Sequence, residues 1–324
     1  MEETRRYRLP VLAIDIGGTN IRTAVVSDKY QIIAKEECLT LADEGPQPVI
    51  ERMLSAVDHL LRNVSLSQLH SISIAAAGAI NVEEGVVTLS PNLPGWHDVP
   101  LRDIVAKKYG VNTFLINDAN AAALGEHRFG AGRGINNLIY LTVSTGIGGG
   151  IIINNQLYSG ECGGAGEIGH MTIDVNGPRG SCGNIGCLEG LASGTAMAKD
   201  AIRRINDGER SSLTEMVGSR IENITAKEVE MAARNGDSLA LEVISQAATY
   251  LGVGLVNLVN IFNPAMIIIG GGMAKMGDLL LNPARQVVKE RAFPLSAQTV
   301  RIVPAQLGDG AGVLGAVIFA RQQR

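Results

Sequence analysis

VLAIDIGGTNIRTAVV, residues 11–26, predicts two β-strands joined by a tight glycine turn. The first strand is the apolar run from Val11 to Ile14, and the turn contains Gly17 and Gly18. The same order of strand, glycine turn and β-branched strand recurs in NLIYLTVSTGIGGGIIINNQ, which begins at Asn137. Because the two copies lie about 130 residues apart, we expect two halves built on one plan.

The rest of the chain alternates strand and helix patterns, which predicts an α/β protein with mixed sheets. Strand patterns are short apolar runs, and helix patterns repeat apolar residues three and four positions apart. The strand patterns are HSISIAAAG (70–78), NTFLIND (112–118), AMIIIG (265–270) and TVRIV (299–303). The helix patterns are VIERMLSAVDHLLRNV (49–64), ANAAALGEH (119–127), residues 188–205, residues 239–261 and AGVLGAVIFARQQ (311–323).

The length of the chain predicts two domains, because 324 residues are many for a single hydrophobic core. We expect residues 1–117 to form a smaller N-terminal α/β domain, which the C-terminal helix 308–324 joins. We expect residues 118–307 to form a larger α/β domain that contains a loop rich in Cys and His, residues 166–189.

The composition favours a cytoplasmic protein with neither nucleic acid nor membrane as a partner. The net charge is −4, and no basic block provides an electrostatic footprint for nucleic acid. No apolar run approaches the roughly 18 residues that span a bilayer, and the opening MEETRRYRLP contains no cleavable hydrophobic segment. Four cysteines in a chain of this size do not resemble a secreted disulfide framework, so we expect a reducing compartment.

The two glycine turns are candidate anion sites. DIGGTN (15–20) follows a strand, its glycines permit close backbone approach, and Thr19 and Asn20 offer donors. Asp15 at the strand end could hold a hydrated Mg²⁺, although an ordinary hairpin turn explains the segment equally well. STGIGGG (144–150) repeats the pattern.

A third glycine turn, Gly270 to Gly272, follows a strand and precedes a helix, as a turn lying against a nucleotide base or ribose would. Other phosphate-binding motifs are excluded. The chain has no Gly-Lys pair and therefore no Walker loop, and IIIGGGMAKMG lacks the spacing of a dinucleotide fingerprint.

Polar residues that could bind a substrate follow the buried strand of NTFLIND and recur in the loop 166–189. Asn117 and Asp118 lie at the carboxyl end of that strand, where side chains open into the crevice of an α/β sheet. A carboxylate there can accept a hydroxyl proton, but a helix N-cap is the simpler interpretation of either residue alone. The loop adds acceptors and donors suited to sugar hydroxyls, and a turn at SPNLPGW adds one more candidate. These residues are Glu167, His170, Glu189 and Asn92.

The loop also contains His170, Cys182 and Cys187 at a spacing that suits a metal, although structural zinc sites use four ligands. The sequence therefore leaves open whether the loop is a metal clip, a substrate site or both.

Together DIGGTN, LTVSTGIGGG, IND at 116–118 and GEIGH followed by CGNIGCLE resemble the ROK family of sugar kinases and repressors, and within it the bacterial glucokinases. The resemblance runs along nearly the whole chain. It implies an actin-like, ribonuclease H-like fold of two duplicated α/β domains, with the substrates in the cleft between them. The implied reaction transfers the γ-phosphate of ATP to the 6-hydroxyl of glucose.

The resemblance also implies a role for each candidate residue. Asp118 is the general base, and the other residues toward the sugar are Gly78, Asn92, Asn117, Glu167, His170 and Glu189. The residues toward ATP and Mg²⁺ are Asp15, Gly17, Gly18, Thr19, Asn20, Thr145, Gly146, Gly148, Gly270, Gly271 and Gly272. We expect Glu167 and Glu189 to face the sugar only.

One departure from the family concerns zinc. The zinc loop of the family reads His, then Cys-x-Cys-x4-Cys, and the first of those cysteines is Gly180 here. His170, Cys182 and Cys187 remain, so we expect zinc to be weakly bound or absent.

Two alternative functions remain open. An N-acylhexosamine kinase or a fructokinase would share the same loops, because one hydroxyl or acyl group changes only the local pocket. A sugar-responsive regulator without catalysis would carry a DNA-reading module of roughly 80 residues before the first turn, whereas only fourteen residues precede Asp15. We also expect a homodimer or a higher homo-oligomer, because the apolar helices after Leu239 exceed what one cleft needs.

Overall fold

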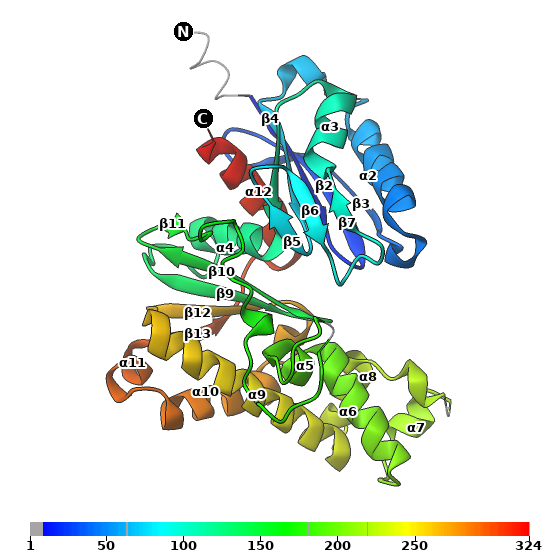
Figure 1. Cartoon of the computed structure of the whole chain (residues 1–324), viewed down its shortest axis with the longest axis vertical. Coiled ribbons are helices and arrows are strands. Elements are labelled where there is room, and N and C mark those ends of the chain that lie inside the picture. The colour runs from blue at the N-terminus through cyan, green and yellow to red at the C-terminus, as the bar shows by residue number, and fades with distance from the viewer. Residues whose placement is uncertain (1–8, 63, 181, 219, 324) are drawn as a thin grey trace. The chain divides into compact units, whose positions relative to one another are not determined.

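The computed structural model describes residues 9–62, 64–180, 182–218 and 220–323 (Figure 1). Residues 1–8 and Arg324, which the expected first domain includes, lie outside the described residues.

The first sheet begins with the hairpin predicted for residues 11–26. β1 (Val11–Ile16) and β2 (Asn20–Val26) pair antiparallel, from Val11 with Val26 to Ile16 with Ile21. β2 pairs antiparallel with β3 (Ile32–Leu39), while β4 (Ser71–Ala76) is parallel to both β1 and β8 (Thr113–Asn117). The strand order is β3-β2-β1-β4-β8, and the sheet is therefore mixed, as predicted.

The second sheet repeats this order. Its strands are β9 (Leu138–Val143), β10 (Ile147–Ile153), β11 (Gln156–Leu157), β12 (Met266–Gly270) and β13 (Arg301–Pro304). Their order in the sheet is β11-β10-β9-β12-β13, with β12 parallel to both β9 and β13. Each sheet therefore places its first three strands on one side and its last two on the other, which confirms the expected duplication.

A third, antiparallel sheet is small. It contains β5 (Ala79–Asn81), β6 (Val86–Leu89) and β7 (His97–Val99). The α-helices are α2 (Pro46–Leu60), α3 (Leu101–Tyr109), α4 (Asp118–Phe129), α5 (Leu188–Ala192), α6 (Gly194–Asn206), α7 (Leu213–Met216), α8 (Ala226–Arg234), α9 (Ser238–Phe262), α10 (Asp278–Arg291), α11 (Pro294–Thr299) and α12 (Ala311–Gln322). The helix expected over 188–205 is two helices, because Ser193 ends α5 and its hydroxyl accepts the Ala196 N–H as the N-cap of α6.

The chain forms two compact units. Unit 1 contains the chain up to Gly134, residues 150–166 and the chain from Gln306, and unit 2 contains residues 135–149 and 167–305. This division differs from the expected boundary after residue 117, because α4 packs against α12 within unit 1. Glycines permit that close packing, since a Cβ atom on Gly315 would collide with the Ala121 carbonyl oxygen.

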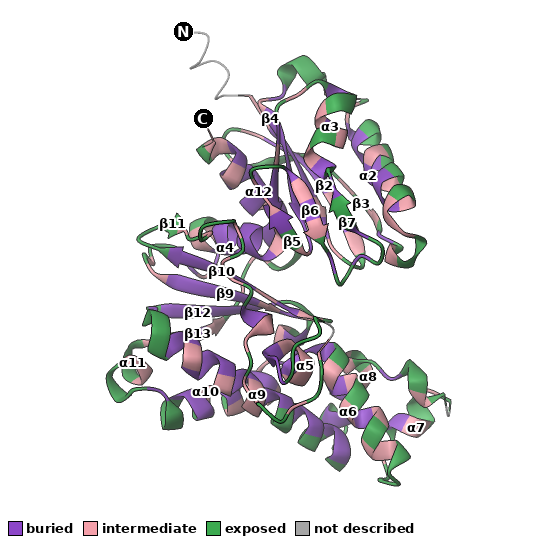
Figure 2. Ribbon diagram, in the orientation of Figure 1, coloured by how far each residue is buried: buried purple, intermediate pink, exposed green. Residues whose placement is uncertain are grey.

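The side chains of β1 alternate between the apolar core of unit 1 and the face of the sheet that α12 covers. Leu12, Ile14 and Ile16 belong to the apolar cluster that includes the buried faces of α2 and α3. Because side chains alternate along a strand, Asp15 points to the opposite face, toward α12. Figure 2 shows that the central strands of this sheet are buried.

The core of unit 2 is organised around α9, which packs against α5, α6, α8 and α10. In the described part of the chain, α9 is the one helix that is long and apolar enough to span a membrane, which the sequence analysis did not anticipate. However, 61% of its most apolar stretch is buried inside the protein, as in the core helix of a globular domain.

Candidate active site

Thr40 forms hydrogen bonds with the first glycine turn. The Gly17 N–H donates to the Asn20 carbonyl (3.0 Å), and the Thr40 hydroxyl donates to the Gly17 carbonyl (2.7 Å). The Thr40 N–H donates to the Thr19 carbonyl (2.8 Å), while Thr19 and Gly18 are exposed. The turn is therefore fixed by its carbonyls and presents its outer surface to solvent.

Gly18 also contacts the turn that contains Asn92. A Cβ atom on Gly18 would lie 3.1 Å from the Asn92 carbonyl oxygen and 3.4 Å from its Cβ. Two sequence-predicted site residues that are far apart in the chain therefore lie side by side in unit 1, and a side chain at position 18 would require the Asn92 turn to shift by a few tenths of an ångström.

Asp15 is largely buried, with 14% of its side chain exposed. Burial raises the pKa of this carboxyl group to about 6, although the Arg22 guanidinium opposes the shift from 4.0 Å away. A desolvated carboxylate at a strand end needs a counter-charge, so its chemistry fits a hydrated Mg²⁺.

Sequence reasoning missed two residues around Asp15. Arg22 is its cross-strand partner in the hairpin and also forms ion pairs with Glu37 (3.1 Å) and Asp309 (3.5 Å). Gly312 of α12 lies directly against the Asp15 carboxylate. The hairpin register could have indicated Arg22, but no local pattern indicates Gly312.

Asn117 and Asp118 lie where β8 ends and α4 begins. The Asn117 Oδ1 accepts the Asn120 N–H (3.0 Å) as the N-cap, and its Nδ2 donates to the Gly78 carbonyl (2.9 Å). The simpler interpretation of Asn117 as a helix cap is therefore correct. The Asp118 Oδ1 accepts the Ala119 N–H (2.8 Å), so this carboxylate is oriented by the first turn of α4.

Gly78 occupies a position that no other residue suits. Its φ is +113°, and a Cβ atom there would lie 2.5 Å from the Leu89 carbonyl oxygen and 2.8 Å from the Cα of Ser90. Gly78 therefore allows β6 to approach the end of β4, and Asn117 holds its carbonyl in place.

The second glycine turn, in unit 2, is held at both ends. The Gly194 N–H at the start of α6 donates to the Ser144 carbonyl (2.7 Å), and the Ile147 N–H donates to Oε2 of Glu189 (2.8 Å). Thr145 is exposed on this turn. The expectation that Glu189 faces the sugar only is therefore wrong, because one of its oxygens binds the turn.

The third turn lies beside the second. Gly271 has a φ of +82°, and a Cβ atom there would lie 2.8 Å from the carbonyl carbon of Val143. A Cβ atom on Gly272 would lie 3.5 Å from the Ser144 hydroxyl oxygen. Two of the three glycine turns expected to contact ATP are thus neighbours in unit 2.

The loop 166–189 is folded by pairing of its two ends. Residues Thr172 and Cys187 form an isolated β-bridge, and the Leu188 N–H donates to the Met171 carbonyl (2.9 Å). This pairing brings His170 close to Cys187. The sequence could not show it, because two-residue bridges leave no periodic pattern.

Glu167 and His170 interact at the start of this loop. The Glu167 Oε2 lies 3.6 Å from Nε2 of His170. Partial burial raises the pKa of the Glu167 carboxyl group, His170 opposes the shift, and the negative charge of Glu189 adds to it. The charges of His170 and Glu189 act on Glu167. The fold therefore brings together, in unit 2, the three residues of this loop that were predicted to bind sugar.

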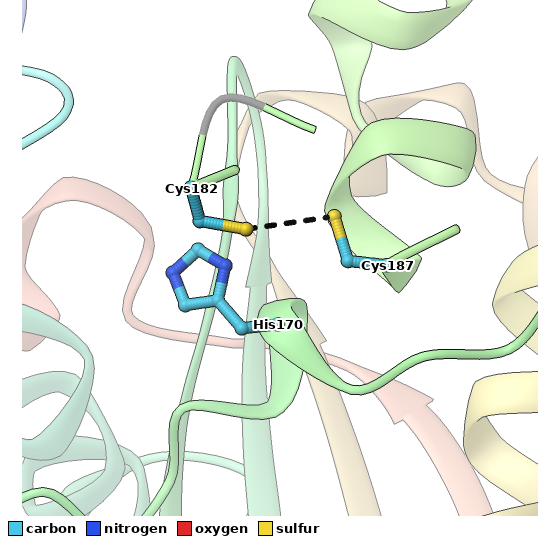
Figure 3. Close-up of side chains that lie close together, drawn as sticks. All are labelled: His170, Cys182 and Cys187. Carbon is cyan, nitrogen blue, oxygen red and sulfur yellow. Dashed lines mark hydrogen bonds between the residues drawn. The ribbon is translucent and has the colours of Figure 1, made fainter. Parts of the chain in front are cut away.

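His170, Cys182 and Cys187 also form a cluster that could hold a metal ion (Figure 3). One ligand atom from each lies within 4.8 Å of the others, and the two sulfur atoms are 4.0 Å apart. The His170 Nδ1 is buried and has no hydrogen-bond partner among the described residues. Three donors thus fit a zinc ion, but Gly180 offers no side chain as the fourth.

The chain as a whole matches a known family. A model of the ROK family matches residues 11–323, so the chain belongs to the ROK family, whose kinases have an actin-like fold of two α/β domains. The family and the fold class expected from the sequence are confirmed.

Individual relatives are glucokinases and repressors. The chain is 37% identical to a glucokinase of Thermotoga maritima over 316 residues, which are 98% of each chain. The crystal structure of a ROK family glucokinase from Streptomyces griseus in complex with glucose and AMPPNP has a TM-score of 0.85 and 34% identity, covering 97% of this chain and 100% of the other. A xylose repressor of Caldicellulosiruptor bescii is 34% identical, over 95% of this chain and 77% of the repressor.

Proposed function

We propose that this protein is an ATP-dependent glucokinase that phosphorylates the 6-hydroxyl of glucose, with Asp118 as the general base. The observation that carries the proposal is the end-to-end similarity to glucokinases, 37% over 98% of the chain. The site residues support it, because Asp118, Glu167, His170 and Glu189 are all present in a pattern that suits a polyhydroxylated substrate.

The chemistry requires little of the base. Phosphoryl transfer depends mainly on alignment of the two substrates and on neutralising charge at the transferred group. The Asp118 carboxylate would accept the hydroxyl proton, while Glu167, Glu189 and His170 would orient the other hydroxyls. The backbone of the turns at 15–20 and 144–150 would contact the phosphates. Mg²⁺ held at Asp15 would supply part of the charge neutralisation when bound.

The remaining roles in the proposal are positional. Asn92 and Gly78 would line the sugar pocket in unit 1, with Asn117 fixing the Gly78 carbonyl. The Gly270 to Gly272 turn would lie by the adenosine. We place the enzyme in the cytoplasm.

A coupled ADP-release assay over a panel of hexoses tests the proposal. The panel contains glucose, mannose, fructose, N-acetylglucosamine and N-acetylmannosamine, each with Mg²⁺ and with EDTA. We expect the highest kcat/KM for glucose and no turnover in EDTA. A preference for fructose or an N-acylhexosamine would instead support the corresponding kinase.

The xylose repressors among the relatives make a regulator the second candidate. A regulator would bind sugar, would retard the migration of promoter DNA in a gel-shift assay, and would not release ADP. Turnover of glucose without a shift would exclude it.

A further inference from the structure

The residue Ile147, at the start of β10, is held by the sugar loop through both of its backbone groups. Its N–H donates to Oε2 of Glu189 (2.8 Å). Its carbonyl packs against Gly169, where a Cβ atom would collide with the carbonyl oxygen. Gly169 directly precedes His170. Glu189 therefore contacts Ile147 directly, and His170 is next in the chain to a residue that contacts it.

The opposite end of the same turn is fixed from the same helical segment. The Ser144 carbonyl accepts the Gly194 N–H (2.7 Å), and the Ser144 N–H donates to the Gly146 carbonyl (2.8 Å). Glu189 belongs to α5 and Gly194 is the first residue of α6, and Ser193 alone separates the two helices. A displacement of Glu189 therefore moves one of the two anchors of the turn relative to the other.

The carboxylate is suited to two simultaneous bonds. An ionised carboxylate has two oxygens with about four acceptor positions and no donor. One oxygen of Glu189 accepts the Ile147 N–H. Because a carboxylate has several acceptor positions, the same group can also accept a sugar hydroxyl. A glutamine in its place has one acceptor oxygen and one donor nitrogen, so it cannot accept on both sides.

We propose that Glu189 is a positioning residue that couples glucose binding to the phosphate-binding conformation of the turn Ser144–Gly149. This inference rests on the proposed glucokinase function and adds a thermodynamic link within the same site. The bond between Glu189 and the Ile147 N–H is already formed without sugar. A glucose hydroxyl on the same carboxylate restricts the motion of that carboxylate further, so the turn has less conformational freedom to lose when the nucleotide binds. Glucose thus raises the affinity for nucleotide, and by linkage the nucleotide raises the affinity for glucose by the same factor.

Glu167→Gln is the matched control. It removes a carboxylate from the same loop, and its ion-pair partner is His170 rather than the turn. Both variants should weaken glucose binding, so loss of sugar affinity alone does not distinguish them. The effect of glucose on the affinity for the nucleotide distinguishes them.

Calorimetry on the full chain tests the proposal, with Mg²⁺ and AMPPNP as the nucleotide probe. For the wild type, saturating glucose should lower the Kd for AMPPNP by about fivefold or more. The coupling ratio is the Kd for AMPPNP without glucose divided by the Kd with saturating glucose. In Glu189→Gln this ratio should fall to within about twofold of one, whereas Glu167→Gln should retain the wild-type ratio. A wild-type ratio of one, or an unchanged ratio in Glu189→Gln, would overturn the proposal.

A second variant covers the case in which Glu189→Gln does not fold. Gly169→Ala leaves every carboxylate in place and displaces the Ile147 carbonyl, so the ratio should fall here too, and a wild-type ratio would contradict the coupling. The proposed function fails separately, because it requires glucose-dependent ADP release from the wild type. Normal ADP release with unaltered coupling in the variants would overturn this inference alone.

Discussion

Gly312 lies against the carboxylate of Asp15, so closely that a Cβ atom at position 312 would stand 2.7 Å from Oδ2 and 3.0 Å from Oδ1. The two residues belong to the last and the first elements of unit 1. Because the strand alternation directs Asp15 toward α12, the helix can pass over it only with a glycine at this position.

Replacing Gly312 with alanine should therefore displace the carboxylate that we assign to Mg²⁺. We expect Gly312→Ala to raise the KM for ATP by about tenfold or more and to lower kcat, with the Kd for glucose little changed. Gly310→Ala is the control, because nothing lies within 4 Å of a Cβ atom there and its φ of −84° suits alanine. Wild-type kinetics in Gly312→Ala would show that Asp15 does not act on the nucleotide side.

The raised pKa of Asp15 predicts that this residue lowers the stability of the protein in the absence of Mg²⁺. Burial raises its pKa from 3.8 to about 6, so the folded state binds more protons than the unfolded state between these values. The free energy of unfolding should fall as the pH rises through this range and stay low above it.

Asp15→Asn removes that cost. It should raise the free energy of unfolding by about 1–3 kcal/mol at neutral pH and have no such effect below the unfolded pKa. Urea denaturation in EDTA at pH 7.5 and near pH 3.5 measures the difference, because these values bracket the shift from 3.8 to about 6. Equal effects at both pH values would mean that the ionised carboxylate is not the source of the cost.

Asp118→Asn should reduce kcat by about 10² or more and leave the affinity for glucose little changed, because asparagine is nearly isosteric but cannot act as a base. The variant should fold, since Asn117 retains the N-cap of α4 and an asparagine oxygen can still accept the Ala119 N–H. Asp103→Asn, in the first turn of α3, is the control. Near wild-type turnover would remove Asp118 from the proposed role.

Exposed apolar side chains at the end of α9 and around α11 support the prediction of a homodimer or a higher homo-oligomer. Ile261, Phe293 and Leu295 are 69%, 67% and 68% exposed, and the Phe293 N–H donates to Oδ1 of Asn260 (2.8 Å), which holds the two segments together. Light scattering at micromolar concentration should give a mass of about twice 34.1 kDa or more, and the double variant Phe293→Asp, Leu295→Asp should give a monomer. A monomeric wild type would contradict the prediction.

The parts of the fold that the sequence predicted are those encoded locally. The two hairpins combine an apolar run, a glycine turn and a β-branched strand within about twenty residues, and no distant contact is needed to recognise them. The break at Ser193 escaped notice because apolar spacing continues across it, although a serine before a helix is a common N-cap. The domain boundary depends on how α4 packs against α12, which is a distant contact.

The candidate site likewise contains residues that local sequence indicates and residues that only distant contacts reveal. Asn117 and Asp118 could be proposed from the sequence because they lie where a buried strand ends and a helix begins. The second role of Glu189 was not, because its partner Ile147 lies 42 residues away and the bond uses a backbone N–H, which leaves no trace in residue type. Gly312 likewise depends on a contact between the two ends of unit 1.

The last prediction concerns Gly180 and zinc. A Cβ atom at this position would lie 2.5 Å from Sγ of Cys187 and 3.6 Å from Sγ of Cys182, so position 180 faces the cluster but supplies no ligand. Losing one thiolate should cost several of the roughly 10–16 kcal/mol typical of a full structural zinc site. Zinc in the wild type should therefore be partial or removable by EDTA.

Gly180→Cys should restore a fourth ligand, provided that the Cys187 sulfur moves by rotation about its single side-chain torsion. Metal analysis before and after EDTA should then give about one zinc per chain that resists the chelator. Val175→Cys is the control, because it adds a thiol to the same loop at a side chain that is 79% exposed. One tightly held zinc in the wild type would contradict the prediction, since it would require a fourth ligand outside the cluster of His170, Cys182 and Cys187.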